Sequence, residues 1–182
     1  MRQTTRGNPG ARRAERTDRQ RHRPEPRPLP PNSKLQCTVS RIADGDSFYC
    51  GSEGRIRLLM IDAPELAQGD AGGRSQAALE AMMPKGTEVN VETDVRSRDR
   101  FDRILGYVYL PDGRMVNEEM ARSGYVTALV YPPNVREAEK IRRAVADARR
   151  ERKGLWATQL FACSPRDYRA GRCARDAKPR SN

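Results

Sequence analysis

The chain has 182 residues, of which 36% are apolar and 32% are charged, and its formal net charge is +11. This length suits one domain, or one domain with tails. The charge lies at the ends: residues 1–33 hold nine Arg and three acidic residues, and residues 158–182 hold six basic and two acidic residues. Residues 34–157 are nearly neutral, with 20 basic and 19 acidic residues. The basic tails suit contact with polyanions such as nucleic acid, although a purely solubilising role explains them equally well.

Two kinds of segment are not visible in the sequence. No window approaches the roughly 18 apolar residues of a membrane span. The N-terminus also lacks the apolar region of a secretory signal. Three explanations remain open: the protein is cytosolic, its true start lies upstream, or a signal has been removed.

The first part of the chain predicts a tail followed by a β-hairpin. Residues 1–33 are rich in Arg and Pro and lack hydrophobic periodicity, which indicates disorder. From Leu35 apolar and polar residues alternate as far as the turn Asp44-Gly45-Asp46. An Asp-Gly pair between two strand-like runs is a strong hairpin signal, and residues 47–50 form the returning strand. Residues 55–61 are apolar enough to be a strand buried on both faces.

The remaining elements alternate between helices and strands. Their predicted positions are helices over 72–83, 116–123 and 135–153, and strands over 87–93, 103–110 and 125–131. Short strands with a turn signal every eight to twelve residues, together with few helices, predict a small, partly open barrel. The fold class is therefore α+β with a mainly β core. Residues 158–182 follow as a basic C-terminal tail.

Residues 44–65 gather carboxylates at the ends of strand-like runs. Asp44 and Asp46 flank the hairpin turn, Asp62 ends the next run, and Glu65 follows a Pro. Such a set supplies hard oxygen ligands for a divalent cation and a base for water. Arg57 lies within the run and can bind phosphate bidentately. Each residue has an ordinary alternative as well: a turn residue, a residue of a plain loop, or an exposed strand arginine.

Zinc chemistry does not suit this motif. No His lies near it, and Cys50 is the only Cys within residues 44–65, so the softer ligands that zinc prefers are too few in this part of the sequence. His22 is the only His and falls in the N-terminal tail. The work of a general base must then fall to a carboxylate, and Glu65 is the candidate.

Five motifs in order resemble the thermonuclease, or staphylococcal nuclease-like, family. They are DGDS…RIRLLMIDAPE, RDRFDRILGYVY, DGRMVNEEMARSGY, YPPN and KGLW, and they extend over roughly residues 35–156. The resemblance implies a domain over residues 34–157 with a five-stranded OB-fold barrel and three helices. It also implies a calcium-dependent nuclease that acts on single-stranded DNA and RNA and leaves 3′-phosphates. We expect a monomer.

The resemblance also assigns positions to the metal. Asp46 and Asp62 match the metal-binding carboxylates of the family. Ala63 matches the residue whose backbone carbonyl joins them. Asp44 matches a further acid that lies close to the metal without contacting it.

Other positions match the residues that act on the phosphate and the nucleotide. Arg57 and Arg103 match the two phosphate-binding arginines, and Glu65 matches the general base. Taken alone, Arg103 could be one charge in the solvated run RDRFDR. Tyr131 matches one of two tyrosines that frame the nucleotide pocket.

Three departures from the family pattern bear on this site. Asp102 stands where the family usually has Gly before the second arginine, and Asp tolerates the left-handed conformation better than most residues. It also adds a negative charge beside Arg103. Leu129 replaces the partner of Tyr131, so base stacking is expected to be looser. Val145 replaces a glutamate of the last helix.

The four cysteines form two local pairs, Cys37 with Cys50 and Cys163 with Cys173. An even count fits disulfides in an oxidising compartment, but four reduced thiols would give the same sequence. Cys37 and Cys50 are offset about the hairpin turn, so a disulfide between them would need a bulge. The family resemblance and the paired cysteines favour a location outside the cytoplasm.

A rival hypothesis of another class also accounts for the fold. A catalytically silent OB-fold module could bind nucleic acid without cutting it. The presence of Asp46, Asp62, Glu65, Arg57 and Arg103 argues against this rival.

Overall fold

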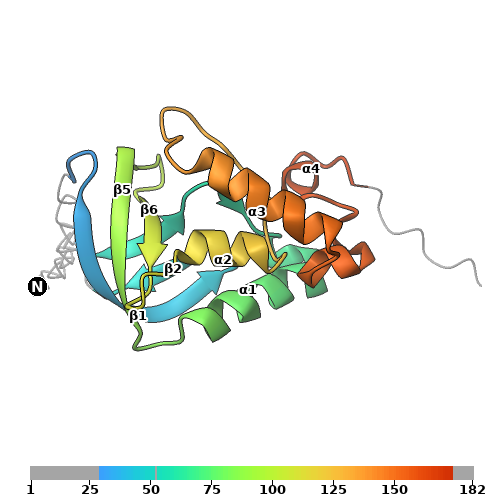
Figure 1. Ribbon diagram of the computed structural model, residues 1–182, viewed down its shortest axis with the longest axis horizontal. Helices are drawn as coiled ribbons and strands as arrows, with labels where there is room; N and C mark the ends of the chain where they lie inside the picture. The colour runs from blue at the N-terminus through green and yellow to red at the C-terminus, as the bar shows by residue number, and fades with distance from the viewer. Residues whose placement is uncertain (1–28, 52, 174–182) are drawn as a thin grey trace, which may run out of the picture.

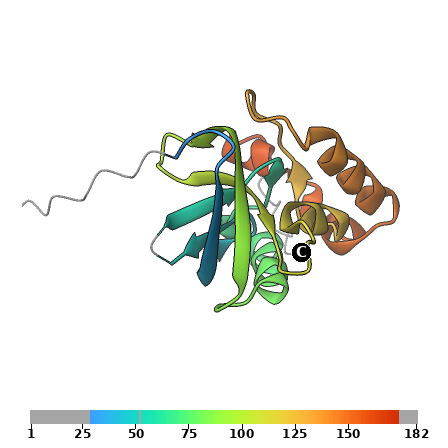
Figure 2. The same cartoon turned by 60° about the vertical axis from the view of Figure 1, so that its left-hand side comes forward.

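Five strands close on themselves into a barrel in the order β1-β2-β3-β6-β5, with β5 returning to β1 (Figures 1 and 2). This computed structural model describes residues 29–51 and 53–173. The barrel strands are β1 (Lys34–Asp44), β2 (Ser47–Cys50), β3 (Gly54–Leu58), β5 (Glu88–Arg98) and β6 (Ile104–Tyr109). Neighbouring strands are antiparallel except for β3 and β6, which are parallel. The predicted five-stranded barrel is confirmed, although the sequence indicated a partly open barrel.

The strand β1 closes the barrel by changing partner along its length. Residues 34–38 pair with β5, which lies beside β1 in Figure 2, and the rest of β1 pairs with β2. Register shifts between Val39 and Arg41, and again near the turn, bend the strand from one partner to the other. A disulfide joins Cys37 of β1 to Cys50 of β2, with the Cα atoms 5.6 Å apart. Cys50 lies opposite Val39 in the register, so the disulfide runs diagonally to Cys37, and the two register shifts bring the cysteines closer than a regular hairpin would.

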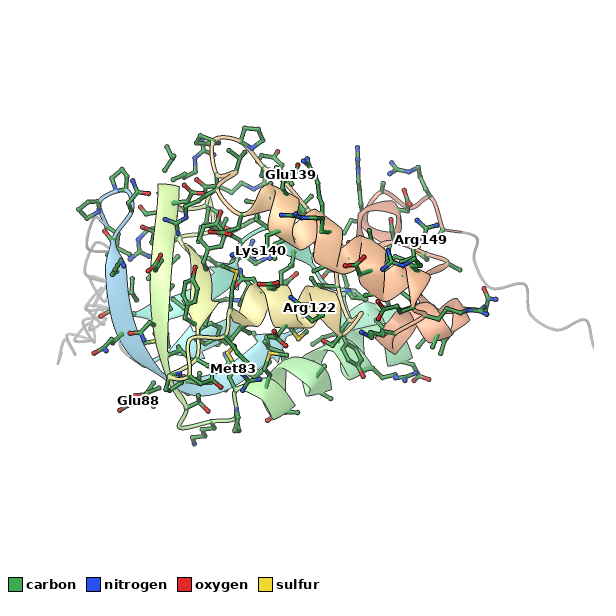
Figure 3. All side chains as sticks on the ribbon, viewed as in Figure 1. Met83, Glu88, Arg122, Glu139, Lys140 and Arg149 are labelled. Carbon is green, nitrogen blue, oxygen red and sulfur yellow. A yellow bond between two sulfur atoms is a disulfide. The ribbon has the colours of Figure 1, made fainter. Side chains whose placement is uncertain are left out.

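Three helices cover the barrel at one side and below (Figure 1), as the sequence predicted. They are α1 (Asp70–Met82), α2 (Val116–Arg122) and α3 (Ala138–Arg150). The helix α3 buries four residues spaced three or four apart: Ala138, Ile141, Ala144 and Ala148. Glu139 and Arg149, labelled in Figure 3, belong to its charged outer face. None of the helices among the described residues is both long and apolar enough to cross a membrane.

The apolar run over residues 55–61 forms two strands instead of the single predicted one. The chain turns at Met60, whose φ of 67° lies in the left-handed region. After this turn the short strand β4 (Ile61–Asp62) leaves the barrel and pairs with β7 (Thr127–Ala128). Asp62 is therefore held beside the barrel, where it can face residues of other elements.

Residues 158–173, which we predicted as part of a basic tail, fold against the domain. They contain the 3-10 helix η3 (Gln159–Phe161) and the short helix α4 (Pro165–Arg169). A disulfide between Cys163 and Cys173 encloses α4. Five-residue helices have too few turns to give a periodic signal, so hydrophobic periodicity could not reveal α4. Residues 174–182, like residues 1–28 of the predicted N-terminal tail, lie outside the described residues.

Candidate active site

A cleft of about 1360 Å³ collects the predicted site residues from distant parts of the chain. The strands β1 to β4, the loop after β4 and the turn before β6 all contribute to its lining. The predicted residues that line it are Asp44, Asp46, Arg57, Asp62, Ala63, Glu65, Arg103 and Tyr131.

Two buried carboxylates share one arginine at the centre of this cleft. The Nη2 atom of Arg57 lies 2.9 Å from Oδ2 of Asp46 and 3.5 Å from Oδ1 of Asp62. Asp46 is 7% exposed and Asp62 is 3% exposed. Burial raises the pKa of Asp46 to about 7, against the opposing attraction of Arg57. The two carboxylates are thus buried side by side, with the positive charge of Arg57 between them.

Asp44 orders the turn that presents Asp46. Its Oδ1 atom accepts hydrogen bonds from the backbone N–H of Asp46 at 3.1 Å and from the hydroxyl of Ser47 at 2.7 Å. Its Oδ2 atom pairs with Arg55 at 2.7 Å. Burial alone would raise the pKa of Asp44, but the hydrogen bonds from Ser47 and Asp46 hold it below its ordinary value. Asp44 thus holds the backbone of Asp46 in place at the turn.

Small residues allow the turn, β4 and α1 to meet closely. A Cβ atom at Gly45 would lie 2.0 Å from the hydroxyl of Ser75 and 2.8 Å from the Cβ of Ala63, so only glycine fits there. The backbone N–H of Ala63 donates to Oδ2 of Asp46 at 2.8 Å. These contacts fix the positions of Asp46 and of the Ala63 backbone relative to each other.

Glu65 lies where the chain leaves β4 and enters the 3-10 helix η1 (Leu66–Gln68). Its backbone N–H donates to the side-chain oxygen of Gln68 at 2.9 Å. A Cβ atom at Gly72 of α1 would lie 2.2 Å from the carbonyl oxygen of Glu65, so the absence of a side chain at Gly72 lets the Glu65 backbone rest directly on the helix. The side chain of Glu65 is 44% exposed and faces the cleft from its edge.

Arg103 lies in the same cleft, held by a carboxylate of its own turn. Its Nε atom pairs with Oδ2 of Asp99 at 2.7 Å. Asp102 has a φ of 61°, the left-handed conformation for which the family pattern favours Gly. The Asp102 carboxylate lies 3.1 Å from Nη1 of Arg98. The carboxylate added by Asp102 therefore pairs with Arg98, whereas Arg103 forms its ion pair with Asp99.

Two exposed aromatic rings stand at the border of the cleft. Tyr131 is 71% exposed and Phe101 is 64% exposed. Leu129 also lines the cleft, as expected for a neighbour of Tyr131. Phe101 was not singled out from the sequence, although its place beside Arg103 in RDRFDR was a usable signal. Val145 packs against the hydrophobic core and not in the cleft.

Arg169 is a site residue that the sequence did not reveal. One guanidinium nitrogen lies 2.7 Å from Oδ2 of Asp62, and another lies 2.8 Å from Oε1 of Glu65. The hydrogen bond with Asp62 raises the pKa of Arg169 above its ordinary value, so the side chain stays charged. The signal that could have found Arg169 is its place inside the Cys163–Cys173 loop, because a closed loop is held against a domain more easily than a free tail.

The donor set of the cleft suits a hard divalent cation. Asp46 and Asp62 offer carboxylate oxygens close together, and the backbone of Ala63, whose N–H contacts Asp46, follows Asp62 directly in the chain. Over residues 29–51 and 53–173, no group of three or more His, Cys, Asp or Glu residues is arranged to hold a metal ion. A cation here would therefore complete its shell with water and with an oxygen of a ligand. Calcium and magnesium accept such shells.

Comparison with known proteins decides the family. The family described as "Staphylococcal nuclease homologue" matches residues 55–158, which is more than half of the chain. The chain belongs to the staphylococcal nuclease family. The predicted resemblance is thereby confirmed. Within this family match lie Arg57, Asp62, Glu65, Arg103 and Tyr131, whereas the C-terminal helix α4 lies beyond it.

Three relatives illustrate the family. The endonuclease YhcR of Bacillus subtilis is 29% identical over 150 residues, which are 72% of this chain but only 12% of that protein. The thermonuclease of Staphylococcus hyicus is 29% identical over 125 residues, 65% of this chain and 73% of its own length. An uncharacterised endonuclease of Escherichia coli is 37% identical over 128 residues, 65% of this chain and 74% of its own length. Membership of this family supports a nuclease function and nucleic acid as the substrate.

Proposed function

We propose that this chain is a calcium-dependent nuclease that hydrolyses phosphodiester bonds of DNA and RNA and leaves 3′-phosphates. The observation that carries the proposal is the shared contact of Arg57 with two buried carboxylates, Asp46 and Asp62. A pair of buried carboxylates costs stability unless a cation or a function needs it. Their place in a cleft that also contains Glu65 and Arg103 supports a function.

The residues that would hold the cation are Asp46, Asp62 and the backbone carbonyl of Ala63. When bound, the cation supplies positive charge to the non-bridging oxygens of the phosphate. Asp44 keeps the turn in place through the N–H of Asp46, so the ligand position does not depend on the cation alone.

Glu65 acts as the general base in this proposal. Its half-exposed carboxylate lines the cleft and accepts a proton from the water that attacks phosphorus. Arg57 and Arg103 bind the phosphate oxygens, where the extra negative charge of the transition state develops. Both arginines contact carboxylates in the structure, so each exchanges a carboxylate oxygen for a phosphate oxygen when substrate binds. One of them also stabilises the leaving 5′-oxygen.

Single-stranded nucleic acid is the preferred substrate in this proposal. Unpaired bases expose their faces for stacking on aromatic side chains, and duplex bases do not. Tyr131 and Phe101 are exposed at the border of the cleft and can accept such bases. The two disulfides support an oxidising location outside the cytoplasm.

The test separates this function from that of a silent nucleic-acid-binding module. The wild-type protein is incubated with denatured DNA in calcium, and acid-soluble nucleotides are measured with and without a chelator. We expect calcium-dependent release that the chelator abolishes. A protein that binds the DNA but releases no nucleotides under either condition would favour the silent module.

Two substitutions test the assigned roles. Glu65→Gln should lower the cleavage rate by about 10²–10⁴-fold because the base is lost, and Arg103→Ala should also lower it strongly because a phosphate contact is lost. Glu88→Gln and Arg114→Ala are the matched controls, since both residues are exposed and neither lines the cleft (Glu88 is labelled in Figure 3). Near wild-type cleavage by both site variants would contradict the assignment.

A further inference from the structure

The C-terminal arm, defined here as residues 158–173, reaches the centre of the cleft. Two hydrogen bonds between residues that do not line the cleft hold this arm against η1. The side chain of Gln68 donates to the carbonyl oxygen of Cys163 at 3.3 Å, and the hydroxyl of Tyr168 donates to the carbonyl oxygen of Ala67 at 3.1 Å. These bonds position the last residue of α4, Arg169, over the carboxylates.

Within the part of the chain that the structure describes, Arg169 makes its ion pairs with groups that the proposed reaction needs. Its two terminal nitrogens bridge Oδ2 of Asp62 and Oε1 of Glu65, a forked geometry that suits a guanidinium. Asp62 is a ligand of the proposed cation, and Glu65 is the proposed base. The guanidinium therefore holds a positive charge between the cation ligand and the base.

We propose that Arg169 is a built-in counter-ion that competes with the divalent cation for Asp62, so that cation binding and docking of the C-terminal arm oppose each other. This inference rests on the proposed function, because it takes Asp62 as a cation ligand. A dication and a guanidinium on the same carboxylate repel each other, and one must weaken the binding of the other. Such coupling is reciprocal: the arm lowers cation affinity, and the cation lowers the occupancy of the docked arm.

Release of the arm would also change the base. While Glu65 pairs with Arg169, its Oε1 atom is occupied by the guanidinium and is not available to a water molecule. When the cation displaces Arg169 from Asp62, the same guanidinium is free to leave Glu65. Loading of the cation and freeing of the base are thus coupled through one side chain, and the protein is least active when no cation is present.

The disulfide between Cys163 and Cys173 sets how firmly the arm docks. It closes a short loop around α4, with the Cα atoms 5.5 Å apart, and so limits the conformations that the undocked arm can reach. A covalently closed arm loses less entropy on docking than an open one. Opening this disulfide should then weaken the competition in the same direction as removing the guanidinium.

The experiment measures the affinity of the full chain for Ca²⁺ alone by isothermal titration calorimetry at low ionic strength, without nucleic acid. Arg169→Gln should bind Ca²⁺ about tenfold more tightly than the wild type, within the usual range of coupling between sites. Arg166→Gln is the matched control because it removes the same charge from the same helix at an exposed position outside the cleft lining. It should bind Ca²⁺ as the wild type does. The double variant Cys163→Ser with Cys173→Ser should also bind Ca²⁺ more tightly.

A second readout follows the arm itself. Adding Ca²⁺ to the wild type should increase hydrogen exchange at backbone N–H groups of α4, such as that of Tyr168, which donates to the carbonyl of Ser164. Equal or weaker Ca²⁺ affinity in Arg169→Gln, or unchanged exchange in α4, would overturn the competition. Absence of Ca²⁺ binding in every variant would overturn the proposed cation site as well, so the two failures are distinguishable.

Discussion

Gly72 gives the sharpest test of how the fold positions the base. In Gly72→Ala the new Cβ atom would lie 2.2 Å from the carbonyl oxygen of Glu65 and 2.7 Å from the Cα of Leu66. Both neighbours are backbone atoms, so the segment must retreat by roughly 1 Å to reach the 3.0–3.4 Å of tight but real contacts. A displacement of about 1 Å in a catalytic group can cost about 10²-fold in rate. We expect a loss of that size in cleavage.

The stability of this variant should change by two opposing amounts. Alanine gains about 0.5–1 kcal/mol over glycine within a helix, whereas overpacking costs about 1–3 kcal/mol. The net loss of stability should therefore be modest, about 0–2.5 kcal/mol, measured by urea unfolding. Gly73→Ala is the matched control, since nothing lies within 4 Å of its Cβ position. It should gain stability and keep its activity.

Cleavage is measured in saturating calcium, with Ca²⁺ affinity recorded for both variants. Because Gly72 contacts the backbone of Glu65 and Leu66, Ca²⁺ affinity should change much less than the cleavage rate. A wild-type cleavage rate in Gly72→Ala would refute the idea that contact with α1 positions Glu65 as the base. Equal losses in both glycine variants would do so too.

Two further predictions concern buried polar groups away from the cleft. Tyr107→Phe removes the hydroxyl that donates to the buried carboxylate of Asp94 at 2.8 Å, which should cost about 1–3 kcal/mol. Burial also raises the pKa of Tyr107, so the folded state keeps a proton that the unfolded state loses above its pKa of about 10. The free energy of unfolding of the wild type should therefore fall as pH rises, by up to about 1.4 kcal/mol per pH unit more than that of Tyr107→Phe. Urea unfolding at about pH 9 to 11 measures both, and an equal pH dependence of the two proteins would contradict this. The Asn117 side chain donates a hydrogen bond to the Leu59 carbonyl at 2.9 Å and accepts one from the Val108 N–H at 2.9 Å. Asn117→Ala removes both and should lower the free energy of unfolding by about 2–5 kcal/mol. A loss under about 1 kcal/mol would show that water replaces these bonds.

The barrel could be predicted because its signals are local. The Asp44-Gly45-Asp46 turn, the alternation in β5 and the glycine after α2 each mark an element within a few residues. The break at Met60 could not be predicted in this way, because a β-like run gives no sign that one residue adopts a left-handed conformation. That break is nevertheless what carries Asp62 out of the barrel and into the cleft.

The site could be assembled from the sequence only where family motifs set the order of residues. Arg57 of β3 and Arg103, which directly precedes β6, are 46 positions apart in sequence, and the parallel pairing of β3 with β6 brings them close together. Arg169 lies beyond the family match, in a segment that looks like a basic tail by composition. Composition reports charge but not docking, and docking of the arm depends on the contacts of Gln68 and Tyr168.

These arginines form ion pairs with carboxylates, and nucleic acid would have to compete with those ion pairs. Arg57 contacts Asp46 and Asp62, Arg103 contacts Asp99, and Arg169 bridges Asp62 and Glu65. In the proposed function, a phosphate would displace carboxylates from Arg57 and Arg103, so its affinity would be a difference between two sets of ion pairs. A cation bound to Asp46 and Asp62 would weaken their ion pairs with Arg57 and so strengthen phosphate binding. Because such coupling is reciprocal, a bound phosphate would strengthen cation binding by the same free energy. Because residues 34–157 carry 20 basic and 19 acidic residues, we expect this local exchange, more than net charge, to bring nucleic acid into the cleft.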